Sequence, residues 1–314
     1  MDSGDLAVFA AVAKTGGITR AAQALNTVQS NVTHRIQMLE AELGVPLFHR
    51  HTRGVTLTSA GEKLLPYAER IARLIGEARE AAADGPVARG KIIIGSLETT
   101  AALRLPPVLA SYAAACPEVD IEIMTGTTAA MIEAVLAHRV EAAFVAGPVD
   151  HPDLVALPVV EEELVLATAP WIDDIAKLRD RAGQLKIVVF RAGCTYRVYL
   201  ERLLAARGLV DVRRLEFGTL DGLIGCVAAG IGVTLLPRAV LAKAESEGRV
   251  ALHAVPDKDA KVTTVLVRRG DSFVSTALRR FIETAQDFWR DRAPEQKVAA
   301  ARIAPQARHS PRKR

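Results

Sequence analysis

Residues 19–62 read TRAAQALNTVQSNVTHRIQMLEAELGVPLFHRHTRGVTLTSAGE, and they decide the fold of the N-terminal part of the chain. Two short helical patterns separated by a turn are followed by a basic hairpin and by the start of another helix. We predict a first helix from Thr19 to about Leu25, with Thr19 as its N-cap and with Ala21, Ala22 and Leu25 on its inner face. Residues 26–28 then form the turn.

The second helix is predicted to begin near Gln29 or Ser30 and to bury Val32, Ile36, Leu39 and Leu43, a helical spacing. Its opposite face is short, polar and free of acids, with Gln29, Ser30, Asn31, Thr33, His34 and Gln37. Such a face suits a helix that enters the major groove of DNA and contacts base edges. A buried helical hairpin would show the same two patterns, so the two helices alone leave both interpretations open.

The segment that follows favours DNA binding. Residues 47–58, LFHRHTRGVTLT, read as two short strands around a tip of His, Arg and Thr closed by Gly54. A hairpin of this kind, a wing, would bring Arg50 and Arg53 against phosphates or into the minor groove. Thr58, followed by Ser59 and by Glu62 three residues later, predicts a capping box at the start of a long helix.

With these elements in place, the chain resembles the LysR-type transcriptional regulators. The resemblance is carried by TRAAQAL, VQSNVTHRIQMLEAELG, PLFHR and RGVTLTSAGEKLL, in this order, and it extends over roughly residues 5–290. It implies a winged helix-turn-helix domain over residues 1–58 that binds double-stranded operator DNA. It also implies a small-molecule effector, a homodimer or a dimer of dimers, contact with RNA polymerase, and no cofactor.

Position in the second helix makes Gln29, Ser30, Thr33 and His34 the candidates for contact with base edges. Val28 and His34 depart from the family that the chain resembles, in which most members carry Ser at the first position and Arg or Lys is common at the second. The operator sequence therefore stays open. The candidates for contact with phosphates are Thr19, Arg20, Arg50, Thr52 and Arg53.

Residues 59–90 are predicted to form a linker helix and a hinge. From Thr58 to about Asp84 a stripe of apolar residues recurs at helical spacing, formed by Leu64, Ala68, Ile71, Ile75, Ala78 and Ala82. The stripe would equally fit packing within the chain. The resemblance implies instead an antiparallel pair with the same helix of a second copy, which would place two recognition helices about one turn of DNA apart.

The length and the charge of the chain limit its domain organisation and the conclusions that its net charge allows. At 314 residues and 50% hydrophobic content, the chain can form two or three domains with real cores. Residues 290–314 hold eight Lys/Arg and two acids, a net of +6, so the rest of the chain sums to −2 although the net charge is +4. The net charge is therefore no argument for DNA binding, and residues 294–314 are predicted to be a disordered basic tail.

Other features of the composition concern location and cysteine chemistry. The chain contains no run of about 18 apolar residues that could span a bilayer. The acidic N-terminus does not resemble a signal peptide, so we expect a cytoplasmic protein without a membrane partner. Three scattered cysteines argue against a disulfide framework.

After Gly90, strand and helix patterns alternate. The first set comprises strands at 91–95, 119–124 and 141–146 and helices at about 101–115 and 128–138. The second comprises strands at 163–167, 186–190, 212–217 and 232–236 and helices at 195–206 and 220–229. A strand at 262–268 and a helix at about 275–289 return the chain to the first set. Such an order predicts parallel sheets covered on both faces.

The predicted topology is a hinged clamshell of two α/β lobes, similar to the periplasmic-binding-protein-like effector domains of the family that the chain resembles. We expect it over residues 91–293. Lobe I would cover about 91–162 and 268–293, and lobe II about 163–267.

In such a fold, ligands bind between the lobes, where strand carboxyl ends meet helix N-termini. The candidate effector-binding residues at those positions are Ser96, Thr99, Thr100, Thr127, Thr128, Cys194, Thr195, Tyr196, Arg197 and Thr219. Hydroxyl and N–H groups with an arginine nearby suit a small carboxylate or similar anion. Each threonine taken singly could be only an N-cap.

The resemblance supports the same region. It places Thr99, Thr100, Thr127 and Thr195 at positions that often contact effector. The segments GSLETTAALRLPP and EFGTLDGLIGCVAAGIGVTLLP are most similar to a branch named for glutamate-linked regulation. That label does not establish glutamate as the ligand.

The sequence leaves two alternative functions open and argues against a third. A redox-sensing regulator is conceivable, because Cys194 follows a glycine at a helix start beside two arginines, where the pKa of a thiol is lowered, and Cys226 could resolve it. A small-molecule receptor without a DNA role would need only the clamshell. An enzyme is not expected, since the sequence has no Gly-rich phosphate loop, no nucleophile elbow, no metal-ligand spacing and no catalytic candidate.

Overall fold

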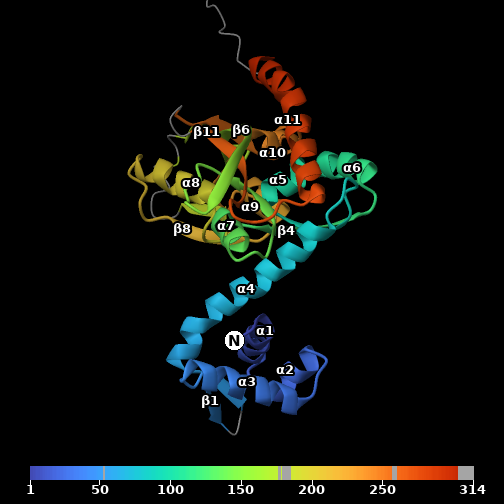
Figure 1. Cartoon of the computed structure of the whole chain (residues 1–314). Coiled ribbons are helices and arrows are strands. Elements are labelled where there is room, and N and C mark those ends of the chain that lie inside the picture. Colours follow the sequence, from blue (N-terminus) through green and yellow to red (C-terminus); the bar gives the residue numbers. More distant parts are fainter. Residues whose placement is uncertain (52–53, 176–177, 179–184, 257–259, 303–314) are drawn as a thin grey trace, which may run out of the picture. The chain divides into compact units, whose positions relative to one another are not determined.

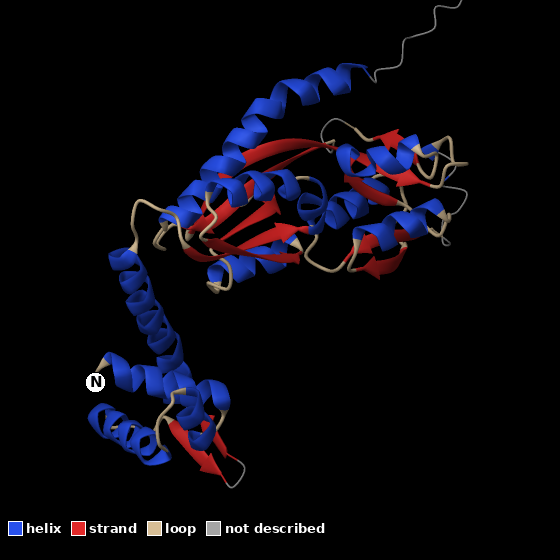
Figure 2. Cartoon of the chain, turned by 90° about the vertical axis from the view of Figure 1, so that its right-hand side faces the viewer, coloured by secondary structure: helices blue, strands red, loops and turns tan. Residues whose placement is uncertain are grey.

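The computed structural model describes residues 1–51, 54–175, 178, 185–256 and 260–302, with side chains described up to residue 290. The chain forms two compact units, Met1–Asp84 and Gly85–Arg314 (Figure 1). The first unit contains helices and one hairpin, and the second contains the remaining strands with helices around them (Figure 2). The predicted fold class is confirmed.

The first unit is built on three helices, α1 (Ser3–Thr15), α2 (Ile18–Ala24) and α3 (Gln29–Leu43). Their fully buried side chains include Phe9 and Val12 of α1 and, as the apolar spacing of α3 predicted, Val32, Ile36 and Leu39. The prediction that α3 begins at Gln29 is confirmed.

Three predictions about the ends of these helices are wrong. Gly17 is the N-cap of α2, so Thr19 lies exposed within the first turn. Leu25 and Leu43 are 37% and 38% exposed and do not belong to the core. Leu25 is the C-cap of α2 and Leu43 is the last residue of α3, so both stand where their helices end.

The wing consists of β1 (Phe48–His51) and β2 (Gly54–Leu57), paired antiparallel. Helix α4 (Ser59–Ala83) follows, with Thr58 as its N-cap. The Thr58 hydroxyl accepts from the Gly61 N–H at 3.1 Å and donates to the Pro46 carbonyl at 2.7 Å. The predicted box between Ser59 and Glu62 is wrong, because the cap lies one residue earlier and Gly61 has no side chain to return the bond.

The apolar stripe of α4 is only partly covered. Ala68 is buried, and Leu64 and Ile71 pack at the edge of the first unit's core. Ala78 and Ala82 are exposed, and the neighbouring Leu74 is 47% exposed.

In the second unit, lobe I has a central sheet of β4 (Val119–Gly126), β3 (Gly90–Leu97), β5 (Ala142–Ala146) and β11 (Lys261–Arg269), in that order. The first three are parallel, as predicted, and β11 is antiparallel to β5. Helices α6 (Leu105–Ala115) and α11 (Thr276–Arg302) contact each other over a core with Tyr112, Phe144 and Phe281. Helix α7 (Thr128–Leu136) packs on a second core with Met131 and Val145.

The predicted helix over 101–115 is in fact two helices, α5 (Glu98–Leu103) and α6, separated at Arg104. Pro106 and Pro107 explain the break, because proline lacks the N–H that a continuing helix would need and disfavours helical geometry before it. The prolines instead begin α6.

Lobe II is joined to lobe I through β6 (Leu154–Thr168), a strand three times longer than the five residues predicted. Residues 154–163 of β6 pair with β11, and residues 164–168 pair with β9 (Thr234–Pro237) and β10 (Ala251–Ala254). A continuous strand therefore passes through both lobes.

The rest of lobe II comprises parallel strands β7 (Lys186–Phe190) and β8 (Arg213–Phe217) with α8 (Thr195–Ala205), α9 (Leu220–Ala228) and α10 (Arg238–Ser246). Neither α10 nor β10 was predicted. The strand predicted at 232–236 begins at Thr234, since residue 233 makes only an isolated bridge to Ile187.

The last helix of the chain, α11, is longer than the sequence predicted. Helix α11 continues to Arg302, so the prediction of disorder for residues 294–302 is wrong, and residues 303–314 lie outside the described part.

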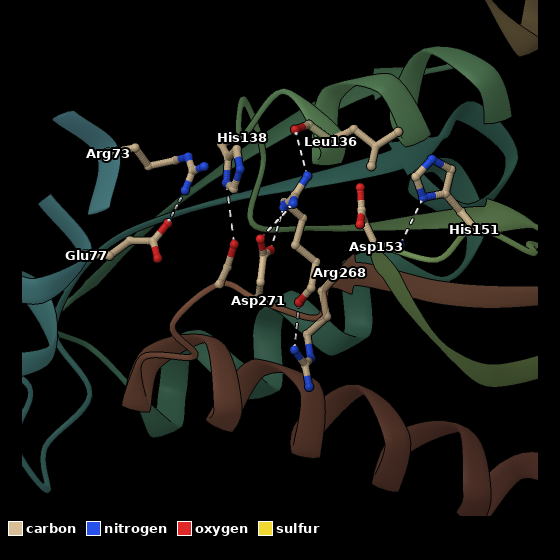
Figure 3. Close-up of polar contacts among 10 residues, drawn as sticks. Arg73, Glu77, Leu136, His138, His151, Asp153, Arg268 and Asp271 are labelled. Carbon is tan, nitrogen blue, oxygen red and sulfur yellow. Dashed lines mark hydrogen bonds and ion pairs between the residues drawn. The ribbon is translucent and has the colours of Figure 1, made fainter. Parts of the chain in front are cut away.

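At the carboxyl end of α7, Arg269 donates to both carboxylate oxygens of Asp271 (2.7 and 2.8 Å) and to the Leu136 carbonyl (Figure 3). This guanidinium lowers the pKa of Asp271 to about 2 and satisfies a helix-end carbonyl.

Candidate functional site

The polar face of α3 is open to solvent. Gln29, Ser30 and His34 are exposed, Thr33 is half-buried, and Val28, the N-cap residue, is 65% exposed. The Thr19 hydroxyl donates to the carboxamide oxygen of Gln29 at 3.3 Å, which leaves the amide N–H groups of Gln29 free to donate outward. Helix α2 therefore orients one of the predicted base-contacting side chains.

The wing is held beside these helices by backbone contacts. The Val55 N–H donates to the Gly16 carbonyl at 3.2 Å, in the turn between α1 and α2. Gly54 has φ 138°, and a Cβ there would lie 2.5 Å from the same carbonyl, so only glycine permits this approach. Glu40 on α3 accepts from the N–H groups of Leu47 and Phe48, at 2.7 and 3.2 Å. Helix α3 and the wing thus form one surface.

The residues predicted to contact phosphates differ in how exposed their side chains are and in whether they already form an ion pair. Arg20 is exposed, with its guanidinium near the Gly17 backbone. Arg50 is 48% exposed and forms a long ion pair with Glu40 at 3.8 Å. Thr52 and Arg53 lie outside the described residues. Arg35, which adds to the local positive charge, is bound to Asp2 and Asp5.

In the second unit, the strand ends of the two lobes enclose a cavity of about 580 Å³, called here the inter-lobe cavity. Its described lining residues are Leu97, Glu98, Thr99, Thr125, Gly126, Thr127, Ala130, Phe190, Arg191, Ala192, Cys194, Tyr196, Phe217, Gly218 and Thr219. Five of the predicted effector-binding residues are among them: Thr99, Thr127, Cys194, Tyr196 and Thr219.

The other five predicted residues lie beside this cavity without lining it. Ser96 and Thr100 are buried, and the Ser96 hydroxyl donates to the Leu97 carbonyl. Thr128 and Thr195 bind each other, with 3.0 Å between their hydroxyl oxygens. Arg197 faces the other way, forming ion pairs with Glu201 at 3.2 Å and Glu216 at 2.7 Å. Its charge is therefore committed within lobe II.

Several lining residues were not predicted as site residues. Glu98 and Arg191 directly follow β3 and β7, and Thr125 is the second-last residue of β4, so their places at strand carboxyl ends were the available signal. Phe190 and Phe217 are the last residues of β7 and β8. Strand-end aromatics look like core residues in a sequence, which is why they were not selected.

Hydrogen bonds join the two lobes around the cavity. The Ala129 N–H donates to the Gly193 carbonyl at 3.1 Å, and the Thr195 hydroxyl donates to Thr128. The Tyr196 and Thr99 hydroxyl oxygens are 3.5 Å apart. Gly193 has φ 87°, and a Cβ there would lie 2.7 Å from Ala129. These contacts hold the lobes together at the edge of the inter-lobe cavity.

Burial raises the pKa of two side chains that line the cavity, the Cys194 thiol and the Tyr196 hydroxyl. Burial raises the pKa of the Cys194 thiol, and the N–H groups of Arg197 and Tyr196 oppose this only in part. The expectation of a lowered thiol pKa is therefore wrong, because desolvation outweighs the nearby positive charges. Burial also raises the pKa of Tyr196, so its hydroxyl stays protonated and able to donate.

An ion pair lies behind the cavity wall. Arg104, at the break between α5 and α6, donates twice to the carboxylate of Glu162 on β6, both at 2.7 Å. Their side chains are only 11% and 7% exposed. Both charges act on the pKa of Tyr196, a residue that lines the cavity, in opposite directions. It anchors the helix that carries Thr99 to the strand that connects the lobes.

A winged helix-turn-helix unit followed by a two-lobed unit with an inter-lobe cavity defines the class of ligand-responsive DNA-binding regulators. The family model described as "LysR substrate binding domain" matches residues 86–290, and that described as "Bacterial regulatory helix-turn-helix protein, lysR family" matches residues 3–62. The chain belongs to the LysR family of DNA-binding transcriptional regulators, with an effector-binding domain.

Relatives agree over nearly the whole chain. It is 43% identical to HTH-type transcriptional regulator GltR of Bacillus subtilis (strain 168) over 291 residues, covering 93% of this chain and 98% of that one. It is 38% identical to HTH-type transcriptional regulator CzcR of Bacillus anthracis over 287 residues, covering 91% and 98%.

Solved structures show the same architecture. Full-length CbnR complexed with its target DNA matches with a TM-score of 0.60 and 25% identity, over 91% of this chain and 99% of that one. A full-length OxyR variant from Pseudomonas aeruginosa matches in fold, with a TM-score of 0.64 and 19% identity over 92% and 95%. Within the described residues, none of the helices has the length and hydrophobicity of a membrane span, and no group of three His, Cys, Asp or Glu could hold a metal ion.

Proposed function

We propose that this LysR-family regulator reads its operator with α3 and the wing and responds to a small carboxylate held in the inter-lobe cavity. The observation that carries the effector part is the convergence of hydroxyls from both lobes, Thr99 and Thr127 with Tyr196 and Thr219, on one cavity bordered by lobe-to-lobe hydrogen bonds. A ligand there would act through its different affinity for two relative placements of the lobes.

The proposed domains are the DNA-binding domain at 1–58, the linker at 59–90 and the effector-binding domain at 91–293. Exposed apolar side chains along α4, Tyr67 at 66% and Leu74 at 47%, support pairing of this helix with a second copy in a homodimer or a dimer of dimers. We further propose a cytoplasmic protein that binds without catalysing a reaction.

The DNA part is tested by two substitutions on the proposed surface. Arg50→Ala should weaken binding to every duplex and flatten the dependence of log K on log salt by about one unit, as loss of one phosphate contact would. Gln29→Ala should change which base pairs are preferred and keep the salt slope. Band-shift titrations on the chain's own upstream region and on random duplexes measure both. Equal affinity of the unaltered protein for the two duplexes would refute sequence-specific binding.

The effector part is tested by filling the cavity. Ala130 on α7 lines it, so Ala130→Leu should abolish the rise in Tm of the full-length protein with small carboxylates and leave operator binding intact. Ala114→Leu, on the exposed side of α6, is the matched control and should keep the rise. A ligand response that survives Ala130→Leu would place the effector elsewhere.

A further inference from the structure

The inter-lobe cavity contains one acid and one base. Among its described lining residues, Glu98 and Arg191 are the only charged side chains. Among the described residues neither side chain has an ion-pair partner, so the two are not paired with each other. Glu98 is half-buried, and one of its carboxylate oxygens accepts from the Thr125 hydroxyl at 2.8 Å. The cavity thus exposes a carboxylate and a guanidinium to the same small volume.

The two charges come from opposite lobes. Glu98 is the first residue of α5 in lobe I, and Arg191 follows β7 in lobe II. The Arg191 guanidinium lies against the loop after β8, 3.6 Å from where a Cβ on Gly218 would stand. Because both side chains line the same cavity, a simple anion bound by Arg191 would share it with the Glu98 carboxylate, and like charges in one site repel. A simple cation would meet the guanidinium in the same way.

A molecule with both charges removes this conflict. An ammonium group would pair with Glu98 and Thr125, and a carboxylate would pair with the planar donor array of Arg191. Thr219, the N-cap residue of α9, also lines the cavity, and its hydroxyl can donate to the same carboxylate. The Phe190 and Phe217 rings form an apolar wall for the remainder of such a ligand.

We propose that the cavity binds a small zwitterion, an α-amino acid, with Glu98 receiving the ammonium and Arg191 the carboxylate. This inference rests on the proposed function and narrows its ligand from any small carboxylate to one that also carries a cation. A cavity of about 580 Å³ lies within the ordinary range for small-ligand sites and accommodates a molecule of this size.

A purely structural role for Glu98 makes a different prediction. An acid in the first turn of a helix is stabilised by the helix dipole, and Thr125 gives it a hydrogen bond. If that were its whole role, Glu98→Gln would lower Tm by the same amount with and without ligand. A role in binding the ammonium instead predicts that the substitution acts on amino acids and spares their analogues that lack the amino group.

The experiment measures binding to the full-length protein by calorimetry, with matched probes. Each proteinogenic amino acid is compared with its des-amino acid and its decarboxylated amine, for example L-leucine with 4-methylpentanoate and 3-methylbutylamine. At least one amino acid should bind about 10-fold or more tightly than both of its analogues, since each lost charge-assisted bond is expected to weaken binding by about 10- to 100-fold. Glu98→Gln should remove the preference over the des-amino acid, and Arg191→Gln the preference over the amine.

Glu122→Gln, at an exposed acid of β4 that pairs with Lys91, is the control and should leave every affinity unchanged. Des-amino acids that bind as tightly as their amino acids, both to the unaltered protein and to Glu98→Gln, would overturn the zwitterion and leave the proposed carboxylate effector standing. An absence of binding by every amino acid would also overturn it. Failure of operator binding in the band-shift assay is a separate result, which would overturn the proposed function itself.

Discussion

Arg104 and Glu162 illustrate how single residues hold the effector-binding unit together. A buried carboxylate is tolerated because a guanidinium donates two short bonds to it, at 2.7 Å each. The net contribution of such a pair is small, since two charges lose their hydration, but removal of one partner leaves the other charge buried alone.

Arg104→Ala should therefore lower the free energy of unfolding of the effector-binding unit by about 3–5 kcal/mol. Arg89→Ala is the matched control, because Arg89 and Glu118 form an ion pair whose side chains are 64% and 59% exposed. It should change the same free energy by at most about 1 kcal/mol. Urea unfolding of the full-length variants gives both values, and similar losses for the two would contradict the account.

The single residue His253 makes the stability of the folded protein depend on pH. Its Nε2 lies 2.8 Å from the hydroxyl oxygen of Thr168, and burial lowers its pKa below the ordinary value of 6.5. The neutral ring is favoured in the folded state, so its contribution to stability is complete above pH 6.5. It is lost as pH falls through the lower pKa of the folded state, because the unfolded chain takes up the proton first.

His253→Gln, which retains a polar partner for Thr168, should reduce the fall in Tm between about pH 7 and about pH 5 relative to the unaltered protein. Thermal scans at a series of pH values measure this difference. His49→Gln, on the exposed wing, is the control and should follow the unaltered protein. Parallel curves for His253→Gln and the unaltered protein would exclude this linkage.

Among the elements, α4 depends on close approach of its first turn to the wing. A Cβ on Gly61 would lie 2.3 Å from the Leu47 carbonyl oxygen, which also accepts from the Thr58 N–H. Because the Leu47 oxygen and Gly61 both belong to the backbone, neither can move away from the other at low cost. Gly76 in the same helix has no atom within 4 Å of the corresponding position.

The two glycines therefore predict opposite effects of the same substitution. Gly61→Ala should destabilise the DNA-binding unit by about 1–3 kcal/mol through overpacking and weaken operator binding by displacing the wing. Gly76→Ala should stabilise it by about 0.5–1 kcal/mol, because alanine loses less entropy in a helix. Differential scanning calorimetry and band shifts on both variants test the pair, and a gain in stability for Gly61→Ala would show that the junction relaxes.

For the whole molecule, dimerisation through α4 decides how strongly the operator is bound. Leu74 is 47% exposed on this helix, and a charge there should disfavour burial against a second copy. Leu74→Glu should therefore give a lower molar mass by light scattering and weaker binding to a duplex with two half-sites, since each half-site would be contacted alone. Glu80→Gln, at an exposed polar position of the same helix, should leave both unchanged. An unaltered mass for Leu74→Glu would place the interface elsewhere.

The sequence by itself determined the elements whose signals are local. Helix α3, the wing and α4 follow from apolar spacing, turn glycines and a polar face, each read within one short stretch of sequence. The alternation of strands and helices after Gly90 likewise predicted the parallel sheet and the two lobes. Local signals failed at helix ends, at Thr19, Leu25 and Leu43, and at the Arg104 break, where neighbouring elements and proline geometry override periodicity.

Only the tertiary structure decided which distant residues meet. Strand ends predicted that Thr99, Thr127 and Tyr196 would approach one another, but the sequence could not show that Arg197 pairs with Glu216 while Arg191 lines the cavity. Nor could it pair Arg104 with Glu162, 58 residues away, or show that burial keeps Cys194 protonated. Periodicity records which face a residue occupies, whereas partners, burial and charge balance depend on how the lobes are joined through β6 and β11.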